Sequence, residues 1–171
     1  MVVYSYKKGR QNMKNIITTI AMFILTFSTK AQTISNDKVI HYLDSFVGLY
    51  LNKQTIKDDV LAKAAKIQSD YMLKTGQITH FQENPIYRTP PLRVFEVDNN
   101  FIRGFVSEIA GGGSIPKFDK KFKCVEEQIA FNILNMFKNS PEHNHILNRA
   151  KFYGYSISFG QYDYFVVIDC V

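Results

Sequence analysis

The end of the chain constrains the fold most, because it contains two strand patterns separated by one turn. In KFYGYSISF the side chains of Tyr153, Tyr155, Ile157 and Phe159 alternate with small or polar ones. This period of two is typical of a strand with one apolar face. The segment GQYD turns the chain, and YFVVIDCV, which begins at Tyr164, is apolar enough to be a mostly buried strand. The sequence therefore predicts two paired strands at this end.

Three long helical patterns precede the hairpin. NDKVIHYLDSFVGLYL, residues 36–51, has an N-cap residue followed by apolar residues at helical spacing. DDVLAKAAKIQSDYMLKTG has acids in its first turn, and Gly76 is the residue at which we expect it to stop. The third helix, VEEQIAFNILNMFKN, has an apolar side formed by Ile129, Ile133, Met136 and Phe137. A short fourth helix is expected behind Ser140 and Pro141, because Ser is a good N-cap and Pro suits the first helical position.

The middle of the chain is less regular. Residues 77–100 are loop-like and contain three prolines, with a short helix expected over residues 92–96. FIRGFVSEIAGGG then reads as a strand that runs into a flexible glycine turn. Helices first, one strand in the middle and a hairpin last indicate an α+β fold with an antiparallel sheet covered by helices.

The first 31 residues have the pattern of a signal peptide. Lys14 lies in a positive segment that begins at Met13, an apolar run covers residues 16–28, and Ala31 ends a short segment of small residues. We expect translation to start at Met13 and cleavage before Gln32, which leaves one domain over residues 32–171. The alternative is an N-terminal membrane anchor, but the run is shorter than the roughly 20 residues of a bilayer span.

Charge and cysteines limit the choice of partners and compartment. The formal charge is +6, yet residues 1–31 hold 5 of the 21 Lys and Arg and none of the 15 Asp and Glu. The rest has 16 basic against 15 acidic residues, so we expect no nucleic acid as a partner. Cys124 and Cys170 could form one long-loop disulfide in an oxidising compartment or remain two buried thiols.

Several polar side chains are candidates for a site. His80 follows the stop of the second helix, in a loop where side chains can converge. Glu108 is a lone carboxylate in an apolar strand beside three glycines, and a buried carboxylate needs partners. His143 and His145 would point roughly 200° apart on a helix, so only one of them should face a given site. Two histidines and one glutamate are also a ligand set for an open zinc site, formed by His80, His143 and Glu108.

Three segments, taken in order, resemble the CAP superfamily, also called the SCP domain family, and particularly its compact bacterial branch. DDVLAKAAKIQSDYMLKTGQITH is similar to the early helix of the family and its trailing histidine. RTPPLRVFEVDNNFIRGFVSEIAGGG resembles the segment that leads to the Glu-Asn signature. FNILNMFKNSPEHNHILNRAKFYGYSIS resembles the later helix, the Ser-Pro-x-His motif and a glycine-containing strand. The family includes cysteine-rich secretory proteins, antigen 5 and pathogenesis-related protein 1.

The resemblance implies a three-layer α-β-α sandwich with a central antiparallel sheet and a cleft. The family's tetrad of two histidines and two acids maps onto His80, Glu108 and His143, with Ser140 in place of the second acid and no role for His145. Ile109 stands where the family has asparagine. With one carboxylate fewer, such a cleft would hold a divalent cation such as zinc or magnesium less strongly.

For function, the resemblance implies a secreted, periplasmic or cell-envelope protein. We expect a non-enzymatic module whose cleft or surface binds an extracellular ligand such as a lipid, a peptide or a glycan. The alternative is a divalent-metal-dependent hydrolase of peptides or esters in the same cleft, with Ser140 beside His143 as a conceivable nucleophile. Neither GxSxG nor HExxH occurs to support a hydrolase. In a third interpretation the polar cluster only stabilises the sandwich.

Overall fold

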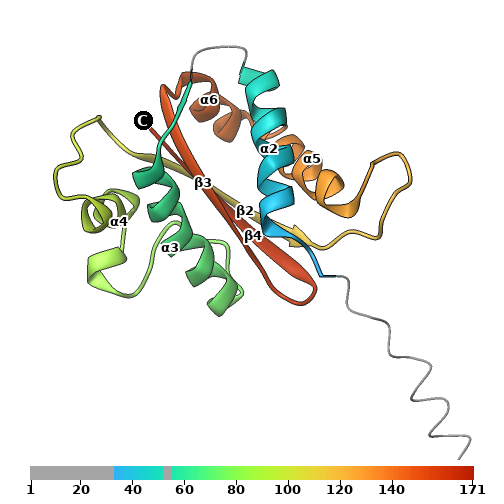
Figure 1. Ribbon diagram of the computed structural model, residues 1–171. Coiled ribbons are helices and arrows are strands. Elements are labelled where there is room, and N and C mark those ends of the chain that lie inside the picture. Colours follow the sequence, from blue (N-terminus) through green and yellow to red (C-terminus); the bar gives the residue numbers. More distant parts are fainter. Residues whose placement is uncertain (1–32, 52–54) are drawn as a thin grey trace, which may run out of the picture. The chain divides into compact units, whose positions relative to one another are not determined.

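The computed structural model describes residues 33–51 and 55–171. The predicted signal peptide and its cleavage position lie outside this part of the chain and stay predictions. Residues Ile34–Val171 form one unit, in which helices cover both faces of a sheet (Figure 1). Within the described ranges, no helix is both long and apolar enough to cross a membrane.

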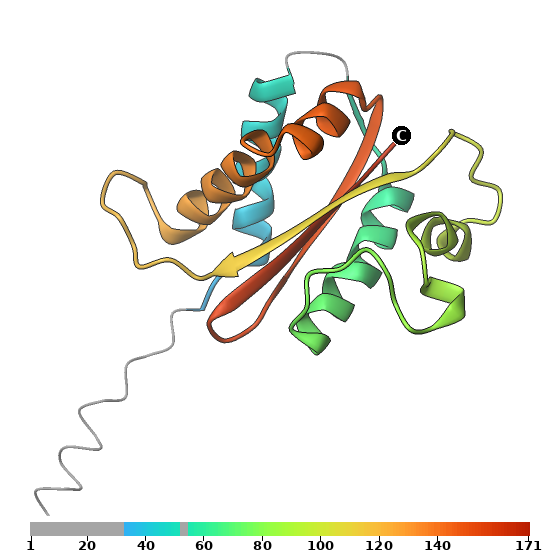
Figure 2. The same ribbon diagram turned by 180° about the vertical axis from the view of Figure 1, so that it is seen from behind.

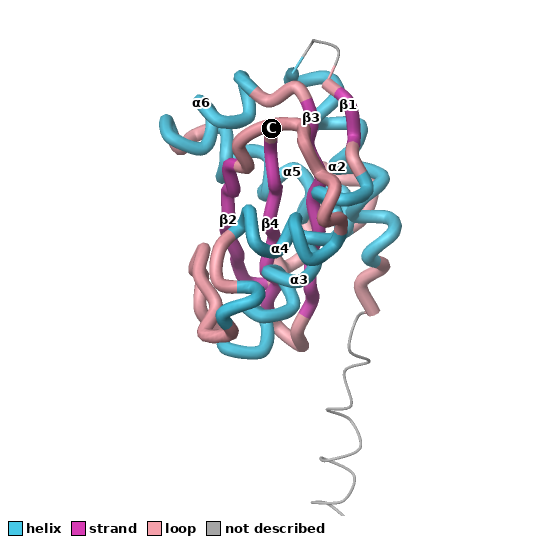
Figure 3. Tube along the Cα trace, turned by 90° about the vertical axis from the view of Figure 1, so that its left-hand side faces the viewer, coloured by secondary structure: helices cyan, strands magenta, loops and turns pink. Residues whose placement is uncertain are grey.

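The sheet has four strands in the order β1-β3-β4-β2, which lie side by side in Figure 3. The predicted hairpin is confirmed as β3 (Phe152–Phe159) and β4 (Asp163–Cys170), and β2 (Ser107–Ser114) pairs antiparallel to the other side of β4. β1 (Ile56–Lys57) pairs parallel to β3. The sheet is therefore mixed rather than wholly antiparallel, and a strand of two residues is too short to leave a sequence pattern.

The expected glycine turn is wrong, because the three glycines lie inside β2. Gly111, Gly112 and Gly113 pair in register with residues of β4. A Cβ atom added at Gly111 would lie 2.4 Å from the methyl carbon of Met136. Glycine is needed here for close approach of a helix to the strand, and not for a turn.

One face of the sheet packs on an apolar layer of helices. It consists of α2 (Asn36–Leu51), α5 (Val125–Lys138) and α6 (Pro141–Arg149). The helix side chains Leu43 and Ile133 and the strand side chains Ile109, Val166 and Ile168 belong to one buried cluster. This cluster is the main hydrophobic core, and its residues follow the periods of 3.6 and 2 on which the predictions rested.

The opposite face is covered by α3 (Asp59–Thr75) and α4 (Pro90–Val97), with the short 3-10 helix η1 (Pro85–Tyr87) before α4. Figure 2 shows the sheet between these helices and the first layer, so the predicted three-layer α-β-α sandwich is confirmed. The α3 helix begins at the N-cap Asp58 and ends at Gly76, whose φ of 69° is left-handed, as the predicted stop requires.

α3 lies very close to β3. A Cβ atom added at Gly154 would be 2.1 Å from the backbone nitrogen of Ala62. The two small apolar clusters on this face contain Leu61, Ala64 and Ala65 of α3. Small residues on both elements therefore set the distance between the helix and the sheet.

Candidate functional site

The centre of the site is the carboxylate of Glu108 in β2. Because side chains alternate along a strand, Ile109 enters the main core while Glu108 points toward α3 and α4. Its side chain is only 1% exposed. A carboxylate that is buried this deeply requires compensating donors.

Arg93 of α4 is the first of these donors. Its side chain is fully buried, and its Nη2 donates a hydrogen bond to Oε2 of Glu108. The same guanidinium donates to the backbone carbonyl oxygen of Tyr87 at 2.9 Å, and both Nη atoms lie 3.4 Å from the carbonyl oxygen of His80. Arg93 thus neutralises Glu108 and also fixes the loop that carries His80.

His80 is the second partner of Glu108. Its Nδ1 lies 2.9 Å from Oε1 of Glu108, and its side chain is 44% exposed. Among the residues that the structure describes, no hydrogen bond of the other ring nitrogen, Nε2, is found. When Nδ1 donates to a carboxylate, Nε2 is the nitrogen that carries the lone pair, so it can accept a hydrogen bond or a proton.

Two glutamines hold the His80 loop on α3. Gln68 is fully buried and donates to the backbone carbonyl oxygen of Thr79. Gln82 donates to Oε1 of Gln68 at 3.0 Å and to the carbonyl oxygen of Ile67 at 3.3 Å. These bonds lie on both sides of His80 in the sequence, so the fold itself holds the imidazole in place.

Asp169 of β4 is a second buried acid at the same place. It lies directly opposite Glu108 in the β2-β4 register and is fully buried. Within the described chain, neither of its carboxyl oxygens has a hydrogen-bond donor. Burial raises the pKa of Asp169 well above its usual value, and the negative charge of Glu108 raises it further, whereas Arg93 lowers it.

The buried charges of Arg93 and Glu108 balance each other when Asp169 keeps its proton. Arg93 supplies one buried positive charge, and Glu108 takes it up. A second ionised carboxylate would have no compensating partner. The negative charge of Glu108, which lies opposite Asp169 in the strand register, also favours the protonated form.

His143 approaches from the other helix layer, at the start of α6. Its ring meets the ring of Phe137 edge-on at 5.4 Å between centroids, and its buried Nδ1 has no partner within the described residues. Burial lowers the pKa of His143, and so does the charge of His80. Hydrogen bonds in the described part of the chain, however, join only His80 to Glu108.

Ser140 occupies the N-cap position of α6, where the sequence predicts it, but its side chain makes no capping hydrogen bond. The helix start is instead fixed by Pro141 and by the bond from the backbone N–H of Asn144 to the carbonyl oxygen of Ser140, at 2.9 Å. No hydrogen bond activates the hydroxyl of Ser140 in the described structure, so its geometry gives no support to a nucleophile.

The residues predicted as metal ligands do not fit a metal ion in this arrangement. In the described ranges, no group of three or more His, Cys, Asp or Glu side chains is placed to hold one. Both oxygens of Glu108 are already engaged, one by His80 and one by Arg93. A cation at Glu108 would have to replace the Arg93 ion pair.

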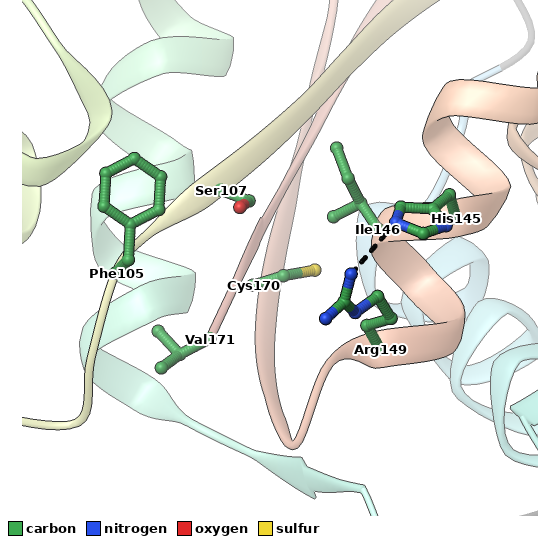
Figure 4. Close-up of a pocket in the computed structure, with 7 residues that line it drawn as sticks. All are labelled: Phe105, Ser107, His145, Ile146, Arg149, Cys170 and Val171. Carbon is green, nitrogen blue, oxygen red and sulfur yellow. Dashed lines mark hydrogen bonds between the residues drawn. The ribbon is translucent and has the colours of Figure 1, made fainter.

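His145 points away from His143, because side chains two residues apart on a helix differ in direction by roughly 200°. It lines a pocket of about 200 Å³, and its Nε2 is 3.3 Å from Nη1 of Arg149 (Figure 4). The other residues that line this pocket are Phe105, Ser107, Ile146, Cys170 and Val171. The two histidines of NSPEHNHIL therefore do not act on one site.

The disulfide considered for Cys124 and Cys170 is not formed, and both residues are thiols. Cys170 pairs with Ser107 at the first residue of β2, whereas Cys124 precedes α5, which starts beyond the Ser114 end of that strand (Figure 1). The eight residues of β2 span roughly 24 Å. A disulfide requires two Cα atoms within about 7 Å of each other, so cysteines at opposite ends of this strand are too far apart to form one.

Arg93 and Asp169 are site residues that the sequence analysis missed. Asp169 carries the same signal as Glu108, a single charge within an apolar strand, because it lies in YFVVIDCV. Arg93 is adjacent to the buried Val94 on a short helix. A short helix gives too little periodicity to tell a buried arginine from an exposed one.

Solved structures of two other proteins share this fold. The chain is similar to an outer surface protein from Borrelia burgdorferi, with 21% identity, a TM-score of 0.60, and coverage of 80% of this chain and 95% of that protein. It is also similar to an extracellular protein containing an SCP domain from Bacillus anthracis strain Ames. That match has 15% identity, a TM-score of 0.53, and coverage of 84% of this chain and 44% of that protein. No protein-family model and no curated protein matches the sequence.

Proposed function

Since the chain has an SCP-like fold, we propose that it is an extracellular binding protein in which His80 is the polar centre of the binding surface. The observation that carries the proposal is the chain of contacts from His80 to Glu108 to Arg93. A half-exposed imidazole is fixed by a fully buried ion pair. Such an arrangement presents one hydrogen-bonding group to a ligand at little entropic cost.

The surroundings of His80 indicate what such a ligand offers. Ile78 and Phe81 lie on either side of it in the sequence and are 57% and 61% exposed. Exposed apolar side chains around a few fixed polar groups are typical of binding surfaces. A lipid, a peptide or a glycan with an apolar face would match this combination.

An extracellular location is supported by two independent observations. The sequence predicts a signal peptide over residues 1–31, and the two structurally similar proteins are an outer surface protein and an extracellular protein. We therefore propose that the domain acts outside the cytoplasm, secreted or held at the cell surface.

The proposal is tested with arrays of lipids, peptides and glycans probed by the unchanged chain, His80→Ala and His41→Ala. His41 is an exposed histidine of α2, in the other helix layer, and serves as the matched control. We expect at least one ligand class that binds the unchanged chain and His41→Ala and is lost in His80→Ala. If His80→Ala binds every ligand as well as the control does, His80 is not the binding centre.

A hydrolase is the second candidate, and the His80–Glu108 pair is the observation that favours it. A carboxylate at Nδ1 prepares an imidazole to accept a proton at Nε2, as general bases do. The described residues place no hydroxyl or thiol within hydrogen-bonding distance of this ring. Turnover of ester or peptide substrates that Glu108→Gln abolishes and His41→Ala leaves intact would establish this activity in place of simple binding.

A further inference from the structure

The loop between β2 and α5 combines positive charge with exposed aromatic rings. It has the sequence KFDKKFK, residues 117–123, and we call it the lysine–phenylalanine loop. It extends from the end of the sheet, between β2 and α5 (Figures 1 and 2). Its lysines all lie at the surface, and Phe118 is 44% exposed.

The loop has a defined conformation, which its neighbours impose. Gln128 of α5 accepts a hydrogen bond from the backbone N–H of Asp119 at 2.9 Å and donates to the carbonyl oxygen of Lys117 at 3.3 Å. Asp119 accepts from the backbone N–H of Lys121 and pairs with its Nζ, each at 3.1 Å. The one acid of the loop is thus used to shape it.

The positive charge of the domain is concentrated here. Outside residues 1–31 the chain has 16 basic and 15 acidic residues. The loop contains four of these basic residues and one of the acidic ones. The remainder is therefore acidic, with 12 basic and 14 acidic residues. In the described structure, no ion pair involves Lys117, Lys120 or Lys123.

The aromatic rings continue from the loop onto the helices. The centroids of Phe122 and Phe131 are 5.3 Å apart, and those of Phe131 and Phe46 are 6.2 Å apart. Phe131 of α5 is 39% exposed, and Nζ of Lys121 lies 5.1 Å from the centroid of Phe122. Lys121 therefore borders a strip of three phenylalanine rings, Phe122, Phe131 and Phe46.

We propose that the lysine–phenylalanine loop docks the protein on a lipid bilayer that contains anionic headgroups. The ammonium groups match the phosphates, while Phe118 and its neighbouring rings enter the interface between headgroups and acyl chains. Lysine stems can lie along the apolar region and keep their charge at the surface. The acidic remainder of the domain orients this loop toward the bilayer.

The test is vesicle flotation with the full chain, whose mass is measured to establish whether residues 1–31 are present. The probes are phosphatidylcholine vesicles with and without phosphatidylglycerol, and soluble polyphosphate. We expect binding to the anionic vesicles, weakened by salt. The triple variant of Lys117→Gln, Lys120→Gln and Lys123→Gln should bind them on the order of a hundredfold more weakly, because each lysine near an anionic surface strengthens binding about fivefold.

The matched control removes three lysines from other parts of the domain, by Lys63→Gln, Lys74→Gln and Lys151→Gln. It has the same net charge and should bind within about threefold of the unchanged chain, because these side chains lie outside the docking surface. Any contribution from residues 1–31 is the same in both triple variants. An equal loss in the two would overturn the proposal.

Phe118→Ser separates a bilayer from a soluble polyanion. We expect it to weaken binding to anionic vesicles at least about fivefold and to leave binding to polyphosphate unchanged. Phe118 is exposed, so circular dichroism should show that the variant is folded. If Phe118→Ser binds vesicles as well as the unchanged chain does, the loop recognises anionic polymers through charge alone, and membrane docking is wrong.

Discussion

The two faces of one sheet differ in how they are stabilised. In β2 and β4, Ile109 and Ile168 face α2 and α5 and join an apolar core, whereas Glu108 and Asp169, the neighbouring residues, face α3 and α4. The first face relies on apolar area removed from water, whereas the second combines two small apolar clusters with charge balance among a few groups. The comparison indicates that the fold is stabilised mainly on the first face and leaves the second free to carry a site.

The largest effect should follow from removing the buried positive charge of Arg93 on the polar face. Arg93→Ala leaves Glu108 and Asp169 buried without a guanidinium, so we expect a loss of about 3 to 5 kcal/mol in the free energy of unfolding. Urea denaturation measures it. Arg88→Ala, at an exposed arginine of the same loop region, is the control and should stay within about 0.5 kcal/mol. Equal losses would show that the ion pair does not stabilise this face.

A cavity in the apolar face should lower stability and leave the site intact. Ile133 is fully buried in α5, and Ile133→Ala should cost about 2 to 4 kcal/mol, whereas Leu49→Ala at an exposed position of α2 should cost little. We expect the NMR signals of the His80 ring to be unchanged in Ile133→Ala and shifted in Arg93→Ala. Shifted His80 signals in both variants would mean that the two faces are not independent.

The polar face should also make stability depend on pH. The raised pKa of Asp169 means that the folded chain keeps a proton which the unfolded chain loses above about pH 4. The free energy of unfolding therefore falls as the pH rises above this value, by up to about 1.4 kcal/mol per pH unit. Asp169→Asn should remove this contribution, measured by urea denaturation at several pH values.

The control is Asp163→Asn, at an exposed acid of the same strand, which should leave the slope as it is. His143 acts in the opposite direction, because its lowered pKa makes the fold less stable below about pH 6.5, where the unfolded imidazole is protonated. Because the two variants and the unchanged chain all contain His143, its contribution to the pH dependence cancels when their slopes are compared. If the slopes of Asp169→Asn and the unchanged chain coincide, Asp169 does not hold a proton in the fold.

The smallest effect is expected at Ser140. Its side chain makes no capping bond, so Ser140→Ala should change the free energy of unfolding by less than about 0.5 kcal/mol. Asp58 is the contrasting cap, since its Oδ1 accepts from the backbone N–H groups of Val60 at 2.9 Å and Leu61 at 3.1 Å. Asp58→Ala should cost about 1 to 2 kcal/mol. A similar cost at Ser140 would show that its hydroxyl caps α6 in solution.

The two faces were not equally predictable from the sequence. The apolar face follows from periodicity, and the helix that contains Ile133 was predicted from it. On the polar face, Glu108 was recognised as a charge that needs partners, but the identity of those partners depends on contacts between segments. Arg93 is fifteen residues from Glu108, and Asp169 meets it only through strand register. A pattern along one segment contains no information on such pairings.

The role of the glycines also could not be predicted from the sequence alone. Their spacing suggested a turn, whereas Gly111 is small because Met136 of another element lies above it. A glycine is needed at position 154 for a similar reason, because the backbone of α3 lies directly against β3 there. What a glycine is for depends on the neighbour that occupies the missing side-chain space, and that neighbour is distant in the sequence.

Gly154 also bears on how such a chain can change by mutation. Any side chain there would push α3 away from the sheet, since the nearest obstacles are backbone atoms of Leu61 and Ala62. α3 carries Gln68, which holds the loop of His80 through Thr79. A substitution at Gly154 would therefore disturb the position of His80 without changing any residue that bonds to it. The geometry of the polar cluster thus depends on the absence of a side chain at residue 154 of β3.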